Sequence, residues 1–412
     1  MDNIYFIIIV GIIIFEYFLT NIIRYLNIKS LHSELPAEFK DVFNIEKYKE
    51  SQLYTKTKES FSYLSSTVML ALSLSIIFFG LYNILDQYII QTFNFESDII
   101  NGLLFYGALV IITDLITTPF TLYNTFVIEE KFGFNNMSLK MFLSDKIKSY
   151  FLIVIIGTPI ISLILYFFES FENYAWFYAW ALMVLFSIIM QPIFNNLIAP
   201  MFNKFEPLEE GPLFDKIKSY LTAIDFPVKK LEVMDGSKRS SHSNAYFSGF
   251  GKNKRIALFD TLIDSMDDDE IIAVLAHEVG HYKLKHIQNG MILGAIQSGI
   301  MLFILSFFIN NTELFEVFKM EHISIYGSLL FFSILYTPIS MIMGFVFNYI
   351  SRKNEFEADN YSLQTTKSPQ HLISALKKLT VENLGNLNPH WLNVALNYSH
   401  PPVLDRINAL KK

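Results

Sequence analysis

Seven long apolar stretches, almost free of charged residues, constrain this chain more than any other feature of its sequence. Each is about 20 to 24 residues long, enough for one helix to cross the hydrocarbon core of a bilayer. Together they contain only two charged side chains, Glu16 and Asp114, each of which either lines a polar interior or reaches toward a span end. The predicted spans are residues 4–23, 62–85, 99–120, 149–168, 174–195, 290–310 and 324–347.

The composition is a mixture of these spans and an ordinary polar surface. Apolar residues and Tyr make up 52% of the 412 residues, and charged residues make up only 17%. Outside the spans, about 27% of the residues are charged, as on a normal water-facing surface. The absence of cysteine excludes a disulfide scaffold, a zinc ribbon and a cysteine nucleophile. A net charge of −7 gives no reason to expect nucleic acid as a partner, whereas the lipid bilayer is one.

The distribution of basic residues predicts how the chain is oriented in the membrane. The first span has no basic residue ahead of it and no small-residue cleavage pattern, so it is expected to be a true span. Lys319 is the one basic residue on the side of the membrane that contains the N-terminus, so this side is predicted to be outside. The other 31 of the 32 basic residues, and the C-terminus, lie in the segments predicted to be cytoplasmic, residues 24–61, 121–148, 196–289 and 348–412.

We therefore expect a mainly α-helical, polytopic membrane protein organised in four parts. The parts are a membrane region with five spans (1–195), a cytoplasmic α+β insertion (196–289), spans six and seven (290–347) and cytoplasmic C-terminal helices (348–412). Within the insertion, β-rich runs bounded by turn residues predict strands at Leu231 to Met234, Ala245 to Phe250 and Arg255 to Phe259. A helix is expected from about Asp268, where a run of acidic residues suits the positive end of a helix dipole.

That helix contains His277-Glu278-Val279-Gly280-His281, an H-E-x-x-H pattern. Two imidazoles four residues apart lie on one helical face and can bind one zinc ion. The side chain of Glu278, next to the first histidine, can reach a water on the metal. The alternative, a polar patch on an exposed helix, is disfavoured because the preceding turns are apolar.

A catalytic zinc needs a third protein ligand, and Glu355 is the best candidate. His281 lies nine residues before the sixth span, and Glu355 lies eight residues after the seventh. Because these spans are antiparallel, helical continuations would place both residues about 12 to 14 Å beyond the same membrane face. Asp359, one turn further on, can accept a hydrogen bond from a ligand histidine, whereas Glu357 is expected to point elsewhere.

The alternative for Glu355 is a solvated charge paired with Arg352 or Lys353. The other histidines are weaker candidates for a metal site. His286 lies five residues from His281, off the ligand face, and is expected at the surface. Those without surrounding candidate ligands are His32, His322, His371 and His390.

Several segments beyond the zinc motif resemble the type I CaaX prenyl proteases, a family of seven-span zinc endopeptidases that trim the last three residues of prenylated proteins. The resemblance extends from about residue 30 to the C-terminus. It includes the C-terminal His400-Pro401-Pro402 with Arg406. The other matching segments are 126–135, 198–205, 242–247, 252–256 and 258–262.

This resemblance implies roles for residues that spacing alone leaves open. It implies that His277, His281 and Glu355 bind zinc, that Glu278 is the general base and that Asp359 supports a ligand from outside the metal shell. It implies that Asn244 holds the substrate backbone, and that His400 and Arg406 line the catalytic site. It also implies that the seven helices enclose a chamber with the zinc near its cytoplasmic side.

The sequence therefore predicts a membrane endopeptidase with one Zn²⁺ per chain, acting near the C-terminus of peptide or protein substrates with or without a prenyl group. One alternative is a quality-control membrane protease of the heat-shock HtpX type, disfavoured by seven spans and the His-Pro-Pro segment. Another is a transporter or lipid-handling protein with a structural metal. Richness in Ile, Asn, Lys, Phe and Tyr hints at an AT-rich genome, which favours a bacterial inner membrane over the endoplasmic reticulum.

Overall fold

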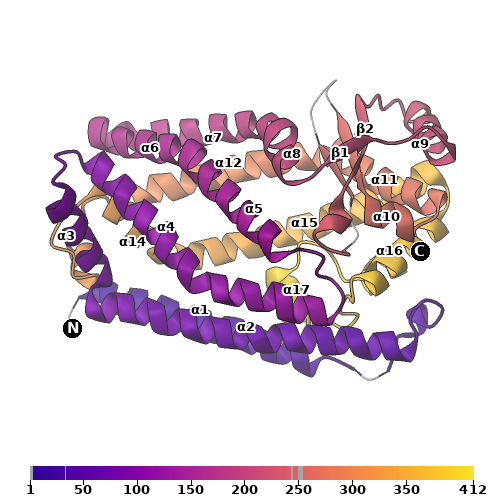
Figure 1. Ribbon diagram of the computed structural model, residues 1–412, viewed down its shortest axis with the longest axis horizontal. Helices are drawn as coiled ribbons and strands as arrows, with labels where there is room; N and C mark the ends of the chain where they lie inside the picture. Colours follow the sequence, from indigo (N-terminus) through magenta and orange to yellow (C-terminus); the bar gives the residue numbers. More distant parts are fainter. Residues whose placement is uncertain (1–2, 33, 243–244, 249–253) are drawn as a thin grey trace.

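Long helices run along the longest axis of the molecule, and a small sheet lies at the end that also contains the C-terminus (Figure 1). The structure is a computed structural model and describes residues 3–32, 34–242, 245–248 and 254–412. The helices of its first half are α1 (Ile4–Lys29), α2 (Ile45–Phe79), α3 (Leu81–Phe93), α4 (Asp98–Tyr123), α5 (Leu139–Leu152), α6 (Thr158–Ser170), α7 (Ala175–Ile193) and α8 (Ala199–Phe202). Those of its second half are α9 (Pro212–Ala223), α10 (Asp260–Ser265), α11 (Asp268–Lys283), α12 (His286–Leu305), α13 (Thr312–Val317), α14 (Ile325–Leu335), α15 (Thr337–Thr366), α16 (Pro369–Glu382), α17 (Trp391–Asn397) and α18 (Val403–Leu410).

The described residues contain six helices that are long and apolar enough to cross a membrane. A seventh span results if α14 and α15, which meet at an angle of 56°, are counted as one broken helix. Three of the six continue from one α-helix through a π-helical turn, over Asn124–Glu129, Ile153–Gly157 and Phe194–Ile198. The prediction of a mainly helical, polytopic membrane protein is therefore confirmed, with the last predicted span bent near its middle.

One predicted span contains a break between two helices. Within the stretch 62–85, which the sequence predicts to cross the membrane, α2 ends at Phe79 and α3 begins at Leu81. Gly80 between them adopts a left-handed conformation (φ 62°), which glycine accepts without the steric penalty of a Cβ. Hydropathy does not detect this break because the residues on both sides of it are mainly apolar.

The two charges in the predicted spans have different surroundings. Asp114 of α4 accepts hydrogen bonds from Lys146 and Tyr150, both on α5. This pairing offsets the cost of placing a carboxylate in an apolar helix. Glu16, in contrast, is exposed on α1.

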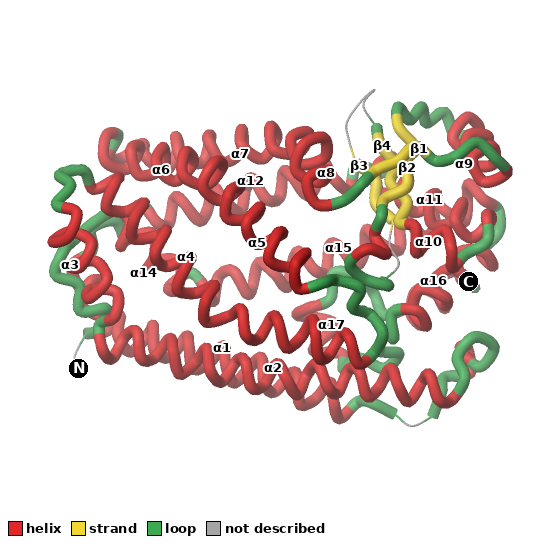
Figure 2. The backbone as a smooth tube through the Cα atoms, in the orientation of Figure 1, coloured by secondary structure: helices red, strands yellow, loops and turns green. Residues whose placement is uncertain are grey.

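The sheet has four strands in the order β1-β2-β4-β3 (Figure 2). β2 and β4 are parallel neighbours in its centre, while β1 and β3 pair antiparallel at its two edges. The strands are β1 (Phe205–Pro207), β2 (Lys230–Met234), β3 (Ala245–Ser248) and β4 (Arg255–Phe259). The three predicted strands are thus confirmed over their described residues, since 249–250 lie outside them. β1 was missed because it has only three residues and includes Pro207, which is tolerated at a sheet edge.

Helix α11 begins where the sequence predicts, and hydrogen bonds from its first turn stabilise that start. Asp267 accepts hydrogen bonds from the backbone N–H groups of Asp269 and Glu270, while the Glu270 side chain accepts one from the N–H of Asp267. This capping box satisfies backbone donors that the first turn leaves unpaired. Buried apolar residues of α11, among them Ile271 and Leu275, then belong to one hydrophobic cluster with residues of β4, α9 and α16.

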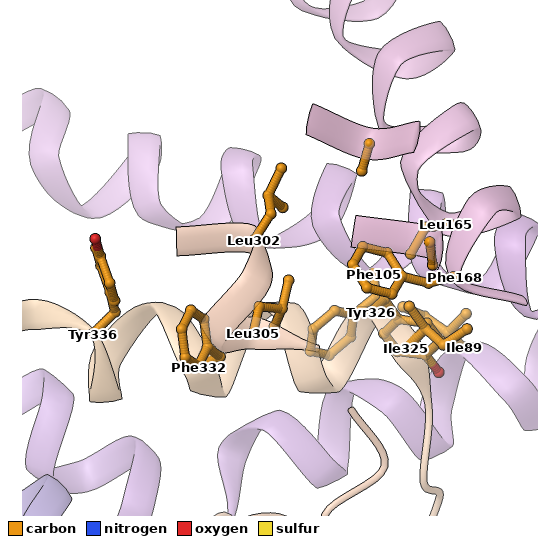
Figure 3. Packing of buried hydrophobic residues seen from close by; sticks show 12 residues of the cluster. Ile89, Phe105, Leu165, Phe168, Leu302, Leu305, Ile325, Tyr326, Phe332 and Tyr336 are labelled. Carbon is orange, nitrogen blue, oxygen red and sulfur yellow. The ribbon is translucent and has the colours of Figure 1, made fainter. Parts of the chain in front are cut away.

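A second apolar cluster is built on helices that extend away from the sheet (Figure 1), and Figure 3 shows its side chains. It joins Phe105 of α4, Leu165 of α6, Leu302 of α12 and Tyr326 of α14. Gly102 of α4 packs directly against Tyr326, and a Cβ at this position would lie 2.9 Å from Cδ1 of that ring. The close approach of α4 to α14 therefore depends on the missing side chain.

We predict that Gly102→Ala lowers the thermal stability of the purified protein, because the added methyl group overpacks a buried contact at a cost of about 1–3 kcal/mol. Gly107→Ala in the same helix is the matched control, since a Cβ there meets no atom within 4 Å. Thermal unfolding of both variants in one detergent measures the difference. Equal melting temperatures would show that the α4–α14 contact is not tight.

Candidate metal centre

Three side chains from two helices meet at the end of the molecule that contains the sheet. His277 and His281 lie one turn apart on α11, and Glu355 comes from α15. One ligand atom of each lies within 4.8 Å of the others, and the described residues contain no second such group of His, Asp or Glu. The Nε2 atoms of the two histidines are 3.1 Å apart, and Oε1 of Glu355 lies 3.2 Å from Nε2 of His281. The structure thus brings together the three residues that the sequence singled out.

The chemistry of these atoms fits a zinc ion. Two imidazole nitrogens and one carboxylate are a ligand set typical of catalytic zinc, which leaves one position for water. Within the described part of the chain, Oε2 of Glu355 is one of the few buried side-chain oxygens that make no hydrogen bond. The Glu355 side chain is only 5% exposed, and Nε2 of His277 and Nη1 of Arg406 each lie 3.4 Å from this oxygen. A cation bound between the three side chains would give it a closer partner.

The outer nitrogen of His277 is held by a second carboxylate of α15. Its Nδ1 lies 2.9 Å from Oδ1 of Asp359. The guanidinium of Arg406 donates two hydrogen bonds to the same carboxylate, at 2.8 and 2.5 Å, and its Nη1 lies 3.4 Å from Oε2 of Glu355. Asp359 and Arg406 are both buried. This network leaves Nε2 of His277 directed at the other two candidate ligands.

The protonation of the site reflects these contacts. Burial disfavours the charged ring of His277, but hydrogen bonds to Asp359 and Glu355 outweigh it and raise its pKa to about 9. A metal ion bound at Nε2 of His277 would have to displace a proton from this ring. Burial raises the pKa of Glu278. Burial also opposes the charge of Arg406, yet hydrogen bonds to Asp359 raise its pKa, so it stays charged.

A cavity of about 370 Å³ opens in front of the candidate ligands. Glu278, His400 and Arg406 line it together with the three ligands. His400 lies at its rim, where its side chain is 65% exposed and its Nε2 is 3.4 Å from Oε1 of Glu355. Asn244, predicted to hold the substrate backbone, lies outside the described residues.

The prediction for His286 is wrong. It was expected at the surface, but its side chain is only 6% exposed and its Nδ1 lies 3.0 Å from Nδ1 of His281. The physical reason is a break in the helix: Lys285 has φ 62°, which ends α11 and turns His286 back toward His281. Glu357 points away from the three ligands, as expected, and Oε2 of Glu357 lies 3.0 Å from Nε2 of His286.

Helices α11 and α15 approach each other closely beside the ligands. A Cβ on Gly280 would lie 3.2 Å from the backbone Cα of Ala358 and 3.1 Å from Cβ of Tyr361. A glycine within the H-E-x-x-H pattern therefore allows α15 to lie against α11.

Family models match both halves of the chain. One, described as the CAAX prenyl protease N-terminal region with five membrane helices, matches residues 24–204, and that of peptidase family M48 matches residues 207–412. The chain belongs to peptidase family M48. It is an integral, multi-pass membrane protein and a metalloendopeptidase.

Curated relatives match this M48 peptidase over most of its length. It is 37% identical over 382 residues to the CAAX prenyl protease 1 homolog of Arabidopsis thaliana. The aligned region covers 91% of this chain and 90% of the plant protein. It is 35% identical to CAAX prenyl protease 1 of Saccharomyces cerevisiae, over 93% of this chain and 89% of the yeast protein. The crystal structure of S. mikatae Ste24p has a TM-score of 0.92 to this structure at 34% identity, with 99% of each chain covered. These matches favour the CaaX protease type over the HtpX type.

We predict that Glu355→Ala lowers the zinc affinity of this M48 peptidase, because it removes one of three candidate ligands. The loss should exceed the 10–100-fold change typical of residues that only orient a ligand. Elemental analysis of purified protein after dialysis measures bound zinc per chain. Glu382→Ala, an exposed carboxylate paired with Lys47 at 3.7 Å, is the control. Unchanged zinc content in Glu355→Ala would exclude Glu355 as a ligand.

Proposed function

We propose that this M48 peptidase is a zinc-dependent membrane endopeptidase that cleaves prenylated substrates near their C-terminus. The observation that supports this most directly is the group of His277, His281 and Glu355, which meet from two helices beside the cavity that Glu278 lines. The names of the relatives, CAAX prenyl proteases, support the substrate class.

We propose one zinc ion per chain, held by Nε2 of His277, Nε2 of His281 and the carboxylate of Glu355. When bound, zinc supplies Lewis acidity that polarises the scissile carbonyl and lowers the pKa of a water. Asp359 fixes the ring of His277 through its Nδ1–H, and Arg406 fixes Asp359 in turn. Arg406 thus acts in the proposal by positioning Asp359.

Glu278 moves the proton in the proposed reaction. Its carboxylate accepts a proton from the attacking water as the bond from oxygen to the carbonyl carbon forms. It then donates that proton to the leaving amine nitrogen as the C–N bond breaks, which regenerates the carboxylate. Partial burial raises the pKa of Glu278 toward the working pH, which makes it a stronger base than a carboxylate in water.

The peptide backbone of the substrate is proposed to lie along β3. β3 is an edge strand, and among the described residues its second edge pairs with no other strand. An extended peptide can hydrogen-bond to such an edge, and β3 contacts the metal-bearing helix α11. Following the resemblance, Asn244, which precedes β3 in the sequence, would hold the substrate backbone, and His400 at the cavity rim would donate a hydrogen bond to the developing oxyanion.

We predict that Glu278→Gln retains zinc and loses about 10²–10⁴-fold in the rate of peptide cleavage, because the amide cannot accept the proton. Zinc content and turnover are measured on the same preparation. Glu382→Ala serves again as the control for both. Full cleavage by zinc-loaded Glu278→Gln would refute this role.

We predict that a farnesylated peptide is cleaved with a lower KM than its unprenylated copy. The lipid adds apolar contact area, worth about 25 cal/mol for each Å² buried. The two peptides are compared with wild-type protein and with Glu278→Gln as the inactive reference. Equal KM values for the two peptides would argue against lipid recognition and would leave the assignment as a peptidase intact.

We propose that the N-terminus lies outside and that the C-terminus and zinc site are cytoplasmic, since 31 of 32 basic residues lie on that side of the predicted spans. The sequence-based preference for a bacterial inner membrane has no support from the relatives named above, which are eukaryotic.

The absence of native cysteine makes this orientation directly testable. In sealed, right-side-out vesicles, an impermeant maleimide should label Glu313→Cys, in the segment predicted to be outside. It should label Asp215→Cys, in the predicted cytoplasmic insertion, only after the vesicles are permeabilised. The reverse pattern would invert the topology.

A further inference from the structure

His286 and Glu357 form a chain of hydrogen bonds that ends on a candidate metal ligand. Nε2 of His281 faces Glu355 and His277, so its Nδ1 points outward. That Nδ1 lies 3.0 Å from Nδ1 of His286, and Nε2 of His286 lies 3.0 Å from Oε2 of Glu357.

The carboxylate at the end of this series of hydrogen bonds determines which ring nitrogens of His286 and His281 carry a hydrogen. A carboxylate only accepts, so Nε2 of His286 must carry the hydrogen that it donates to Glu357. In a neutral ring, Nδ1 of His286 is then the bare nitrogen and accepts a hydrogen bond. Nδ1 of His281 must therefore carry a hydrogen and donate it. This leaves the lone pair of His281 on Nε2, which is the atom that faces the other two ligands.

We propose that His286 and Glu357 are positioning residues that hold His281 in the tautomer and ring orientation required of a metal ligand. The proposal rests on the proposed function only in taking His281 as a zinc ligand. It gives the two histidines of the H-E-x-x-H motif equivalent support by different means. Asp359 contacts His277 directly, while Glu357 reaches His281 through one intervening imidazole.

The burial of His286 distinguishes these hydrogen bonds from a chance contact at the surface. The His286 side chain is 6% exposed, so an imidazole nitrogen without a partner would be costly there. Glu357 is 44% exposed and divides its two oxygens between different surroundings. Its Oε2 faces the buried ring of His286, whereas its Oε1 lies 3.6 Å from the exposed Nζ of Lys353. One carboxylate can thus support the ligand while it remains hydrated.

Zinc affinity of the full-length protein, measured by competition with a chelator, is the main test. We expect His286→Phe to weaken zinc binding about 10–100-fold, the usual effect of losing the outer partner of a ligand histidine. His286→Asn should lose less, because its side-chain oxygen can accept from Nδ1 of His281. Lys353→Gln is the matched control, since it touches Glu357 from the solvent side, and it should leave affinity unchanged. Wild-type affinity in His286→Phe would overturn the proposal.

Because His286 lies between Glu357 and His281, a double variant provides a second test. If Glu357 acts on His281 only through His286, Glu357→Leu weakens zinc binding in the wild-type background and has no further effect when combined with His286→Phe. Additive losses of zinc affinity in the double variant would show that Glu357 does not act on His281 through His286. Glu357→Leu also tests the second link if His286→Phe fails to fold, because Glu357 is partly exposed.

A spectroscopic measurement separates positioning of the ligand from general stability. The visible absorption of the Co²⁺-substituted protein reports the geometry of the ligand set, and we expect its bands to shift in His286→Phe and not in Lys353→Gln. Thermal unfolding of each variant controls for folding. An unshifted spectrum with a lowered melting temperature would assign His286 a purely structural role. Because these measurements report metal and not turnover, a wild-type protein that binds zinc and cleaves no peptide would refute the proposed function alone.

Discussion

The contact between the imidazoles of α11 and the carboxylates of α15 is the interaction on which the site depends. Isolated buried charges are costly, and removing one partner of a buried pair leaves the other uncompensated. Here each buried ionic group has an opposite: Arg406 contacts Asp359 and Glu355, and both carboxylates contact His277. The same atoms therefore stabilise the packing of two helices and define a place for a cation.

Helix α15 holds this arrangement as one rigid element. Its apolar first half belongs to the bent span, and the helix continues without interruption from Thr337 to Thr366. Glu355, Glu357 and Asp359 all project from its second half. A candidate ligand and two proposed anchors thus share one backbone, so their relative positions do not depend on a loop.

The meeting of the three candidate ligands could be predicted from the sequence, because local periodicity and span geometry both point to His277, His281 and Glu355. The burial of His286 against His281 could not be predicted, because a spacing of five residues separates the two faces only in a continuous helix. Lys285 gives no sequence signal for the left-handed conformation that ends α11. The break at Gly80 was missed for a different reason, because hydropathy alone does not separate two apolar helices that meet at one glycine. The proximity of His400 to Glu355 arises from tertiary packing of α17 and α18 against α15 and α16, which no periodicity describes.

Gly280, which is not a candidate ligand, determines how closely α11 and α15 approach each other at the site. Because its missing Cβ lets the backbone of α15 lie against α11, it fixes the spacing between the helix that supplies two nitrogens and the helix that supplies the carboxylate. A larger side chain at position 280 would have to displace Ala358 and Tyr361 of α15, and so would move Glu355 relative to the two histidines.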